Sequence, residues 1–98
     1  VCVAEIDGQS YPVKDWSRGG VQIEGASRDF KDNQSVEVVL KFRLSNDIVE
    51  IKNKGIIARK TAENIGIAFK PLNILAQNAF QRVIDDAVAS EFADSQSA

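Results

Sequence analysis

One short stretch of the sequence places a carboxylate, a hydroxyl and a pair of glycines close together. It reads DWSRGG and runs from Asp15 to Gly20. The side chains of Asp15 and Ser17 can cap a turn by accepting hydrogen bonds from nearby backbone N–H groups. The same carboxylate can accept two N–H donors side by side, which matches the Watson–Crick edge of guanine. The stretch therefore fits either a capped turn or a guanine-binding turn, in which the bare Gly20 would let a planar base approach.

Other residue types in the chain give little support to catalysis or metal binding. The sequence has no histidine, which is the commonest general base and a frequent metal ligand. Cys2 and several serines are candidate nucleophiles, but no imidazole can activate them. Asp85 and Asp86 are adjacent on an expected helix and cannot converge on one point. The polar loop at 29–33 lacks the glycine and glutamate of a calcium loop. We therefore expect neither an enzyme nor a metal site.

Length and composition bound the class of protein. The 98 residues fit one domain, and a content of 44% hydrophobic and 27% charged residues excludes a disordered chain. The net charge of −2 gives no overall attraction to duplex nucleic acid or to an anionic membrane. No apolar run approaches the ~20 residues that span a bilayer, so no direct membrane insertion is expected. A single cysteine, Cys2, favours a reducing, cytoplasmic setting.

Alternating apolar residues predict six short strands. They are expected at 1–6, 11–15, 21–24, 36–42, 48–61 and 65–69. Asp7 and Gly8 form a strong hairpin signal, because both central residues of a type I′ turn need positive φ. The fifth strand is too long to be flat, so we expect a bulge near Gly55. Phe30 is expected to be buried beneath the polar loop at 26–35.

The pattern changes to a helical period after Pro71. Apolar residues recur at i, i+3, i+4 and i+7 as far as Phe92, with Asn73 as the expected N-cap. Residues 1–92 are thus expected to form the domain, and 93–98 a polar tail or linker. Six short strands and one terminal helix favour a small closed or nearly closed barrel. The wide apolar stripe of the helix suits a barrel mouth, or pairing with a second copy as a homodimer.

Several segments of this sequence resemble one known family. Asp15-x-Ser17-x-x-Gly20, placed between two strands, is similar to the D/N-x-S-x-x-G motif of the PilZ family. The segment GQSYPVKDWSRGGVQIEG looks like PilZ domains in which DWS precedes a glycine pair, and GIIARK, NIGIAF and a helix resemble the closing strands of the family. The resemblance covers about 1–92. It implies a mainly β fold, a small six-stranded antiparallel barrel with one C-terminal α-helix.

The resemblance also implies a ligand, the bacterial second messenger cyclic di-GMP. In the family the D/N-x-S-x-x-G turn holds guanine and ribose, which assigns ligand binding to Asp15, Ser17 and Gly20. A second family segment, R-x-x-x-R, grips phosphates just before the first strand. No two arginines of this sequence stand four positions apart, and residue 1 already lies in the first expected strand. Either the segment lies upstream of residue 1, or the protein is a PilZ member that does not bind the nucleotide.

Two more residues of the turn are candidate ligand contacts. If the strand pleat persists, Trp16 points opposite to Asp15 and Ser17 and packs on the barrel or the helix, which we favour over base stacking. Arg18 could reach a phosphate, although a solvated turn arginine is the favoured interpretation.

Three functions follow from these patterns. The first is a cyclic di-GMP-sensing regulatory module of a larger bacterial protein, with that ligand and a neighbouring domain as partners. The family suggests exopolysaccharide synthesis, secretion or motility as the process, on the cytoplasmic side. The second is a PilZ-type protein–protein interaction module without a nucleotide. The third is a barrel of another family, in which Asp15 and Ser17 are occupied by local backbone bonds and face no groove.

Overall fold

The expected arrangement of strands and helix is confirmed. The computed structural model describes residues 2–25, 27–44 and 47–96, except for the side chains of 27 and 90–96. Its strands are β1 (Cys2–Ile6), β2 (Gln9–Ser17), β3 (Gly20–Glu24), β4 (Ser35–Arg43), β5 (Ile48–Lys60) and β6 (Asn64–Phe69). A short 3-10 turn (Ser27–Asp29) precedes β4, and the helix α1 spans Ile74–Gln96.

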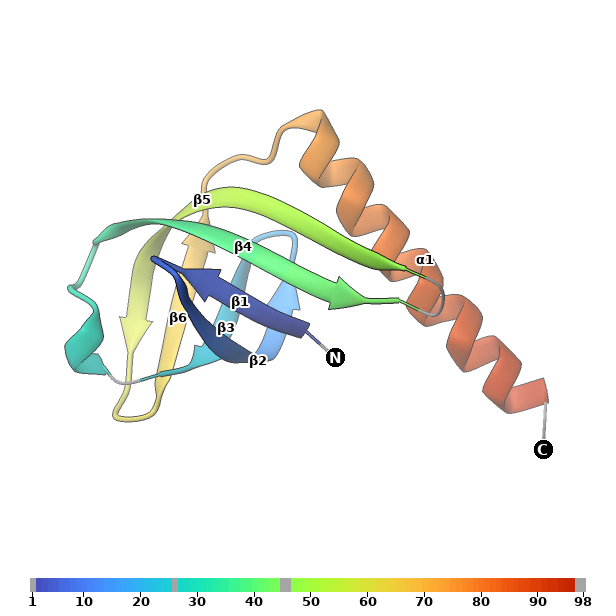
Figure 1. The fold of residues 1–98 in the computed structure, drawn as a ribbon, viewed down its shortest axis with the longest axis horizontal. Helices are drawn as coiled ribbons and strands as arrows, with labels where there is room; N and C mark the ends of the chain where they lie inside the picture. Colours follow the sequence, from blue (N-terminus) through green and yellow to red (C-terminus); the bar gives the residue numbers. More distant parts are fainter. Residues whose placement is uncertain (1, 26, 45–46, 97–98) are drawn as a thin grey trace.

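All strand pairs are antiparallel and the sheet closes on itself. The order around the barrel is β1-β2-β3-β6-β5-β4 (Figure 1). The pairs β1–β2, β2–β3, β4–β5 and β5–β6 are hairpins of strands that follow one another in sequence. β3 and β4 do not pair, and the β3–β6 and β1–β4 pairs close the barrel. The first hairpin is the one that the sequence predicts, since Asp7 and Gly8 have φ values of 52° and 79°.

The bulge expected near Gly55 lies elsewhere in β5. The register there shifts between Ile57 and Arg59, so the extra residue is Ala58. Gly55 serves close packing instead, because a Cβ at this position would lie 2.7 Å from Cγ2 of Ile67.

An aromatic cluster fills one end of the barrel. β2, β4 and β6 run in the same direction, so Trp16, Phe42 and Phe69 all lie towards the end at which these strands finish. Phe80 of α1 packs among them with ring centroids 5.8–6.3 Å away and is fully buried. Ala76 and Val83 flank it on the same helix face, and α1 thereby covers this end.

The helix begins where the sequence indicates and runs further than expected. Oδ1 of Asn73 accepts a hydrogen bond from the backbone N of Ala76 at 2.8 Å, which makes Asn73 the N-cap. α1 continues to Gln96, so 93–96 are helical, and these residues include no glycine or proline that would stop a helix. Residues 97 and 98 lie outside the described residues. No helix in the described ranges is long and apolar enough to cross a membrane.

Candidate ligand-binding groove

A bulge in β2 sets the direction of the motif side chains. Lys14 is an extra residue on β2, because Val13 and Asp15 pair with adjacent residues of β3. In a regular register Asp15 would pair with Val21, whose side chain is buried in the core. Bulges redirect the side chains that follow them. This one turns Asp15 to the outer face of the barrel.

Trp16 therefore points into the barrel. Its ring stacks on Phe80 with centroids 5.8 Å apart and an interplanar angle of 23°. It also meets the edge of Phe42, with centroids 4.9 Å apart. The indole lies on the opposite side of β2 from Asp15 and Ser17, as its position in the strand predicts.

Asp15 and Ser17 are exposed, and each accepts one local hydrogen bond. Oδ1 of Asp15 accepts from the backbone N of Trp16 at 2.9 Å, and Oγ of Ser17 accepts from the backbone N of Gly19 at 3.1 Å. These are the bonds of a capped turn. A carboxylate has about four acceptor positions and a hydroxyl can still donate its proton, so both side chains keep capacity for a ligand.

Gly20 is required by the packing of β3 on β6. It pairs with Ala68, and a Cβ at Gly20 would clash with the carbonyl oxygen of Ile67. The backbone N of Phe69 also donates to the carbonyl oxygen of Gly19 at 2.9 Å. The missing side chain at Gly20 thus has a structural reason that is independent of any ligand.

Arg18 is directed towards the helix. Its guanidinium donates a hydrogen bond to Oε1 of Gln81, which joins the β2–β3 turn to α1. Arg18 is not among the described residues that line the groove beside the motif. The structure therefore groups Asp15, Ser17 and Gly20 and separates Arg18 and the Trp16 ring from them.

The outer wall formed by β2, β3, β6 and β5 carries an open groove. A hollow of about 200 Å³ is lined by Asp15, Ser17 and Gly20. This hollow adjoins a larger one of about 600 Å³, which continues across β6 to β5. The two hollows share four lining residues, Ser17, Gly20, Val21 and Gln22. Local turn bonds and an open groove thus occur together, whereas the third function considered above requires that no groove be present.

Arg59 lies at the far side of this groove. Asp15 pairs with Gln22, Gln22 with Gly66, and Gly66 with Arg59, so the four residues form one row across four strands. The position of Arg59 beside the groove could not be predicted from the sequence. Regular alternation along β5 places Arg59 on the same face as Ile57, which is buried in the core.

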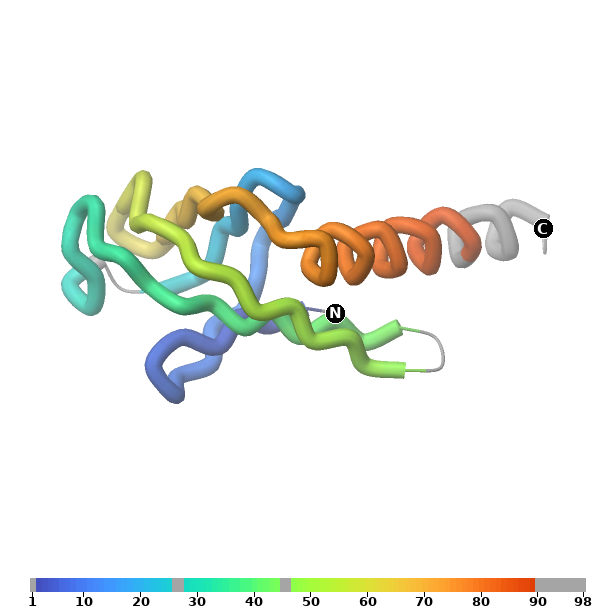
Figure 2. The backbone as a smooth tube through the Cα atoms, turned by 90° about the horizontal axis from the view of Figure 1, so that it is seen from above, coloured from blue at the N-terminus to red at the C-terminus, as the bar shows by residue number. Residues whose placement is uncertain are grey.

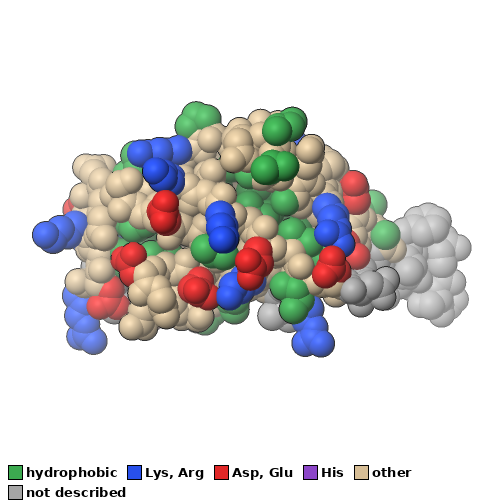
Figure 3. Space-filling model, turned by 45° about the horizontal axis from the view of Figure 1, so that its top comes forward, with side chains coloured by type: hydrophobic (Ala, Val, Ile, Leu, Met, Phe, Trp, Pro, Cys, Tyr) green, Lys and Arg blue, Asp and Glu red, His purple; other side chains and the backbone are tan. Residues whose placement is uncertain are grey.

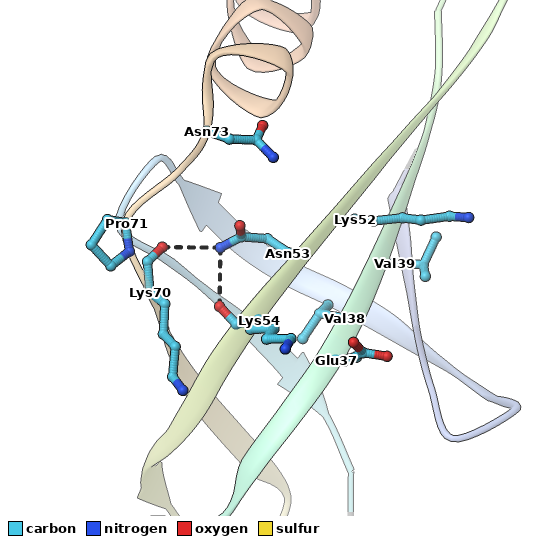
Figure 4. Close-up of a pocket in the computed structure, with 9 residues that line it drawn as sticks. All are labelled: Glu37, Val38, Val39, Lys52, Asn53, Lys54, Lys70, Pro71 and Asn73. Atoms are coloured by element: carbon cyan, nitrogen blue, oxygen red, sulfur yellow. Dashed lines mark hydrogen bonds between the residues drawn. The ribbon is translucent and has the colours of Figure 1, made fainter.

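A separate hollow of about 380 Å³ lies near the start of α1 (Figure 4). Lys52, Lys54 and Lys70 are among its lining residues. Nδ2 of Asn53 donates to the carbonyl oxygens of Lys54 and Lys70, each at 3.0 Å. Figure 4 shows Lys52 and Lys70 extending in different directions, so these two ammonium groups do not converge on one anion. We interpret this hollow as a structural feature, at which the hydrogen bonds of Asn53 hold the segment leading into α1 against β5.

Nucleophile and metal chemistry gain no support from the side-chain environments. Burial raises the pKa of the Cys2 thiol to about 11, which keeps it protonated and unreactive at neutral pH. Within the described part of the chain, no group of three or more Cys, Asp or Glu side chains could hold a metal ion. Figure 3 shows acidic and basic side chains intermixed on the face that it displays.

A closed six-stranded barrel, a covering helix and an outward Asp-x-Ser-x-x-Gly turn beside a groove define a small β-barrel module with a candidate site on its outer wall. Residues 1–86 match the family model described as PilZ domain, and the chain belongs to this family. PilZ domains are generally associated with cyclic di-GMP binding and are typically non-catalytic binding modules. A comparison with curated proteins found no match to the chain.

Proposed function

We propose that this chain is a cyclic di-GMP-sensing regulatory module of a larger bacterial protein. One observation on the chain itself carries the proposal: Asp15 and Ser17 face an open groove while the intervening Trp16 faces the core. The Asp15 carboxylate would accept the two neighbouring N–H donors of guanine, and the Ser17 hydroxyl would add a further polar contact.

The strand geometry suits phosphate contacts from residues upstream of β1. The pairing of β1 with β2 begins at Val3 and Pro12, whereas β2 continues as far as Ser17. A segment leading into Cys2 would therefore emerge beside the half of β2 that carries the motif. We expect an R-x-x-x-R segment there, whose guanidinium forks would grip the phosphates.

Ordering of that segment over the groove would be the signalling step. A ligand shifts such an equilibrium only by its differential affinity for the two states. The ordered segment would alter the contact with a neighbouring domain of the parent protein. The family suggests exopolysaccharide synthesis, secretion or motility as the process, with the domain in the cytoplasm or on the cytoplasmic side of the inner membrane.

Calorimetric titration of cyclic di-GMP tests this function. It compares this chain with the same chain extended by its native upstream residues. We expect binding in the longer protein, loss of binding in its Asp15→Ala variant, and unchanged binding in Glu37→Ala, a matched exposed carboxylate on β4. Asp15→Ala should cost only ~1 kcal/mol of stability through the lost turn bond. No heat of binding in either unmutated protein would contradict the proposal.

A second candidate is a PilZ-type interaction module that dimerises through α1 without binding the nucleotide. The observation in its favour is the exposure of apolar side chains on the helix, with 66% for Ile74, 76% for Leu75 and 60% for Val88. Light scattering would then report a dimer mass that Leu75→Glu reduces to that of a monomer. A monomer mass for the unmutated chain at high concentration would exclude this candidate.

A further inference from the structure

We propose that Arg59 is a ligand-binding residue of the groove and that it holds a phosphate of the ligand whose guanine lies on Asp15. The inference rests on the proposed function and deepens it. It assigns a phosphate contact to this chain itself, in addition to any contacts from upstream arginines.

The direction of Arg59 depends on the bulge at Ala58. In a regular register Arg59 would pair with Ile65, which is fully buried, and its side chain would enter the barrel. A guanidinium without a partner is costly in such a place. With Ala58 as an extra residue, Arg59 pairs with Gly66 and points outward.

Two bulges act on the same row of the barrel wall. Lys14 on β2 and Ala58 on β5 are the extra residues, and these strands are the two outer members of the β2-β3-β6-β5 wall. Each bulge turns one charged residue to the outer face, and the two charges are opposite. The backbones of Asp15 and Arg59 are three strand spacings apart, roughly 14 Å. Bulges are over-represented beside binding sites, where they redirect side chains, and this pair produces a site with a negative and a positive side.

The groove between these two residues has room for a ligand. Gly66 lies next to Arg59, and a Cβ there would be 3.4 Å from Cβ of Arg59. The absence of that side chain leaves space for Arg59 to lie across the sheet. Gly20 and Ala68, which pair with each other, also line the groove, so small residues extend from Gly66 to the motif.

The charge distribution indicates an anion beside Arg59. Arg59 is the one charged residue among the described residues lining the larger hollow. Arg18 and Arg82 donate side-chain hydrogen bonds within the protein, whereas no ion pair or hydrogen bond joins the Arg59 guanidinium to another described residue. A free guanidinium fork over a groove of small residues matches the geometry of a phosphate.

The test measures cyclic di-GMP affinity by calorimetry in the chain extended by its native upstream residues. Arg59→Ala should weaken the affinity roughly tenfold to hundredfold, as expected for loss of a charge-assisted hydrogen bond. Arg59→Lys should recover part of this loss, because a point charge remains. Arg43→Ala is the matched control, an exposed arginine on β4 outside the groove, and should stay within twofold. Higher salt should narrow the difference between Arg59→Ala and the unmutated protein.

A second probe, guanosine, separates a phosphate contact from a guanine contact. Guanosine has no phosphate, so its NMR shifts at Ser17 and Gly20 should be the same in the unmutated and Arg59→Ala proteins. Loss of those shifts in Arg59→Ala would overturn the phosphate assignment.

The outcomes distinguish this inference from the function on which it rests. Affinity that falls in Asp15→Ala but not in Arg59→Ala would overturn the role of Arg59 and leave the nucleotide-sensing function standing. Absence of cyclic di-GMP binding to the unmutated extended protein would overturn both.

Discussion

Gly20 shows that one motif residue can be required by the barrel itself. Its Cβ position is blocked by the backbone of β6, and not by the space in which a ligand would lie. Loss of ligand binding after substitution at Gly20 would therefore not identify a ligand contact. Asp15 and Ser17 are better probes, because their side chains are exposed and carry only local turn bonds.

We predict that Gly20→Ala destabilises the fold by about 1–3 kcal/mol, the usual cost of forcing an extra carbon into a packed region. Urea unfolding in the absence of ligand measures it. Gly19→Ala is the matched control, because a Cβ there would meet only Oγ of Ser17 at an ordinary 3.6 Å. Its effect should stay within about 0.5 kcal/mol, as for most surface substitutions. Equal stability of the two variants would contradict the packing role of Gly20.

We predict that Cys2 reacts slowly with iodoacetamide in the folded protein. Its pKa is raised to about 11 by burial, so the thiolate fraction at pH 8 is low, and urea-unfolded protein should react much faster. Because the folded-state pKa is the higher one, this group's contribution to stability is fully present below the pKa of an ordinary thiol and is lost as pH rises from there through about 11. Equal rates in folded and unfolded protein would show that the thiol is not buried.

At the scale of elements, the aromatic cluster joins the helix to the barrel through Phe80. We predict that Phe80→Ala destabilises the protein by roughly 3–5 kcal/mol, because it leaves a cavity beside Trp16 and Phe42. Thermal or urea unfolding followed by Trp16 fluorescence measures this change. Leu75→Ala on the same helix is the control, since its side chain is 76% exposed. A loss below 1 kcal/mol in Phe80→Ala would contradict the packing of α1 described above.

The strands, the first hairpin and the start of the helix are predictable from the sequence, because each depends on local chemistry. Alternation marks the strands, positive φ explains Asp7 and Gly8, and a side-chain oxygen at Asn73 caps the helix. The motif is also recognisable, since Asp15, Ser17 and Gly20 have a fixed spacing in one turn.

The two bulges are not predictable in the same way. An extra residue in a strand reverses the direction of all the side chains that follow it in that strand. The sequence of the strand does not mark the extra residue, because the register is fixed only by pairing with the neighbouring strand. The glycine at position 55 led us to expect the bulge of β5 there, whereas the pairing of β5 with β6 places it at Ala58. The same long-range pairing turns Arg59 outward, so no local pattern reveals its place beside the groove.

At the scale of the whole molecule, the domain is elongated. Its extents are 45 × 29 × 21 Å, because α1 and the β4–β5 hairpin reach side by side beyond the rest of the barrel (Figures 1 and 2). Nη2 of Arg82 on the helix lies 2.6 Å from Oδ2 of Asp47 on the hairpin. This pair joins the two projecting elements.

We predict that Arg82→Ala raises the pKa of Asp47. The hydrogen bond from Arg82, together with one from the backbone N of Ile48, holds this pKa below its ordinary value. Because the folded-state pKa is the lower one, the stabilisation is present above the ordinary Asp pKa and is lost as pH falls through the folded-state value. The effect on stability should be small, since both groups are exposed. Carboxyl carbon NMR across a pH titration checks the direction, and an unchanged Asp47 pKa would contradict it.

Closure of the barrel between β3 and β6 also constrains how the protein folds. These strands are far apart in the chain, and the wall that carries both Asp15 and Arg59 exists only after they pair. Each early hairpin can form from neighbouring residues, but this pairing must first overcome the entropy of closing a long loop. We therefore expect the groove to form late in folding. During synthesis it cannot form until β6 has left the ribosome, and we expect refolding on the millisecond-to-second scale typical of β-rich domains with distant contacts.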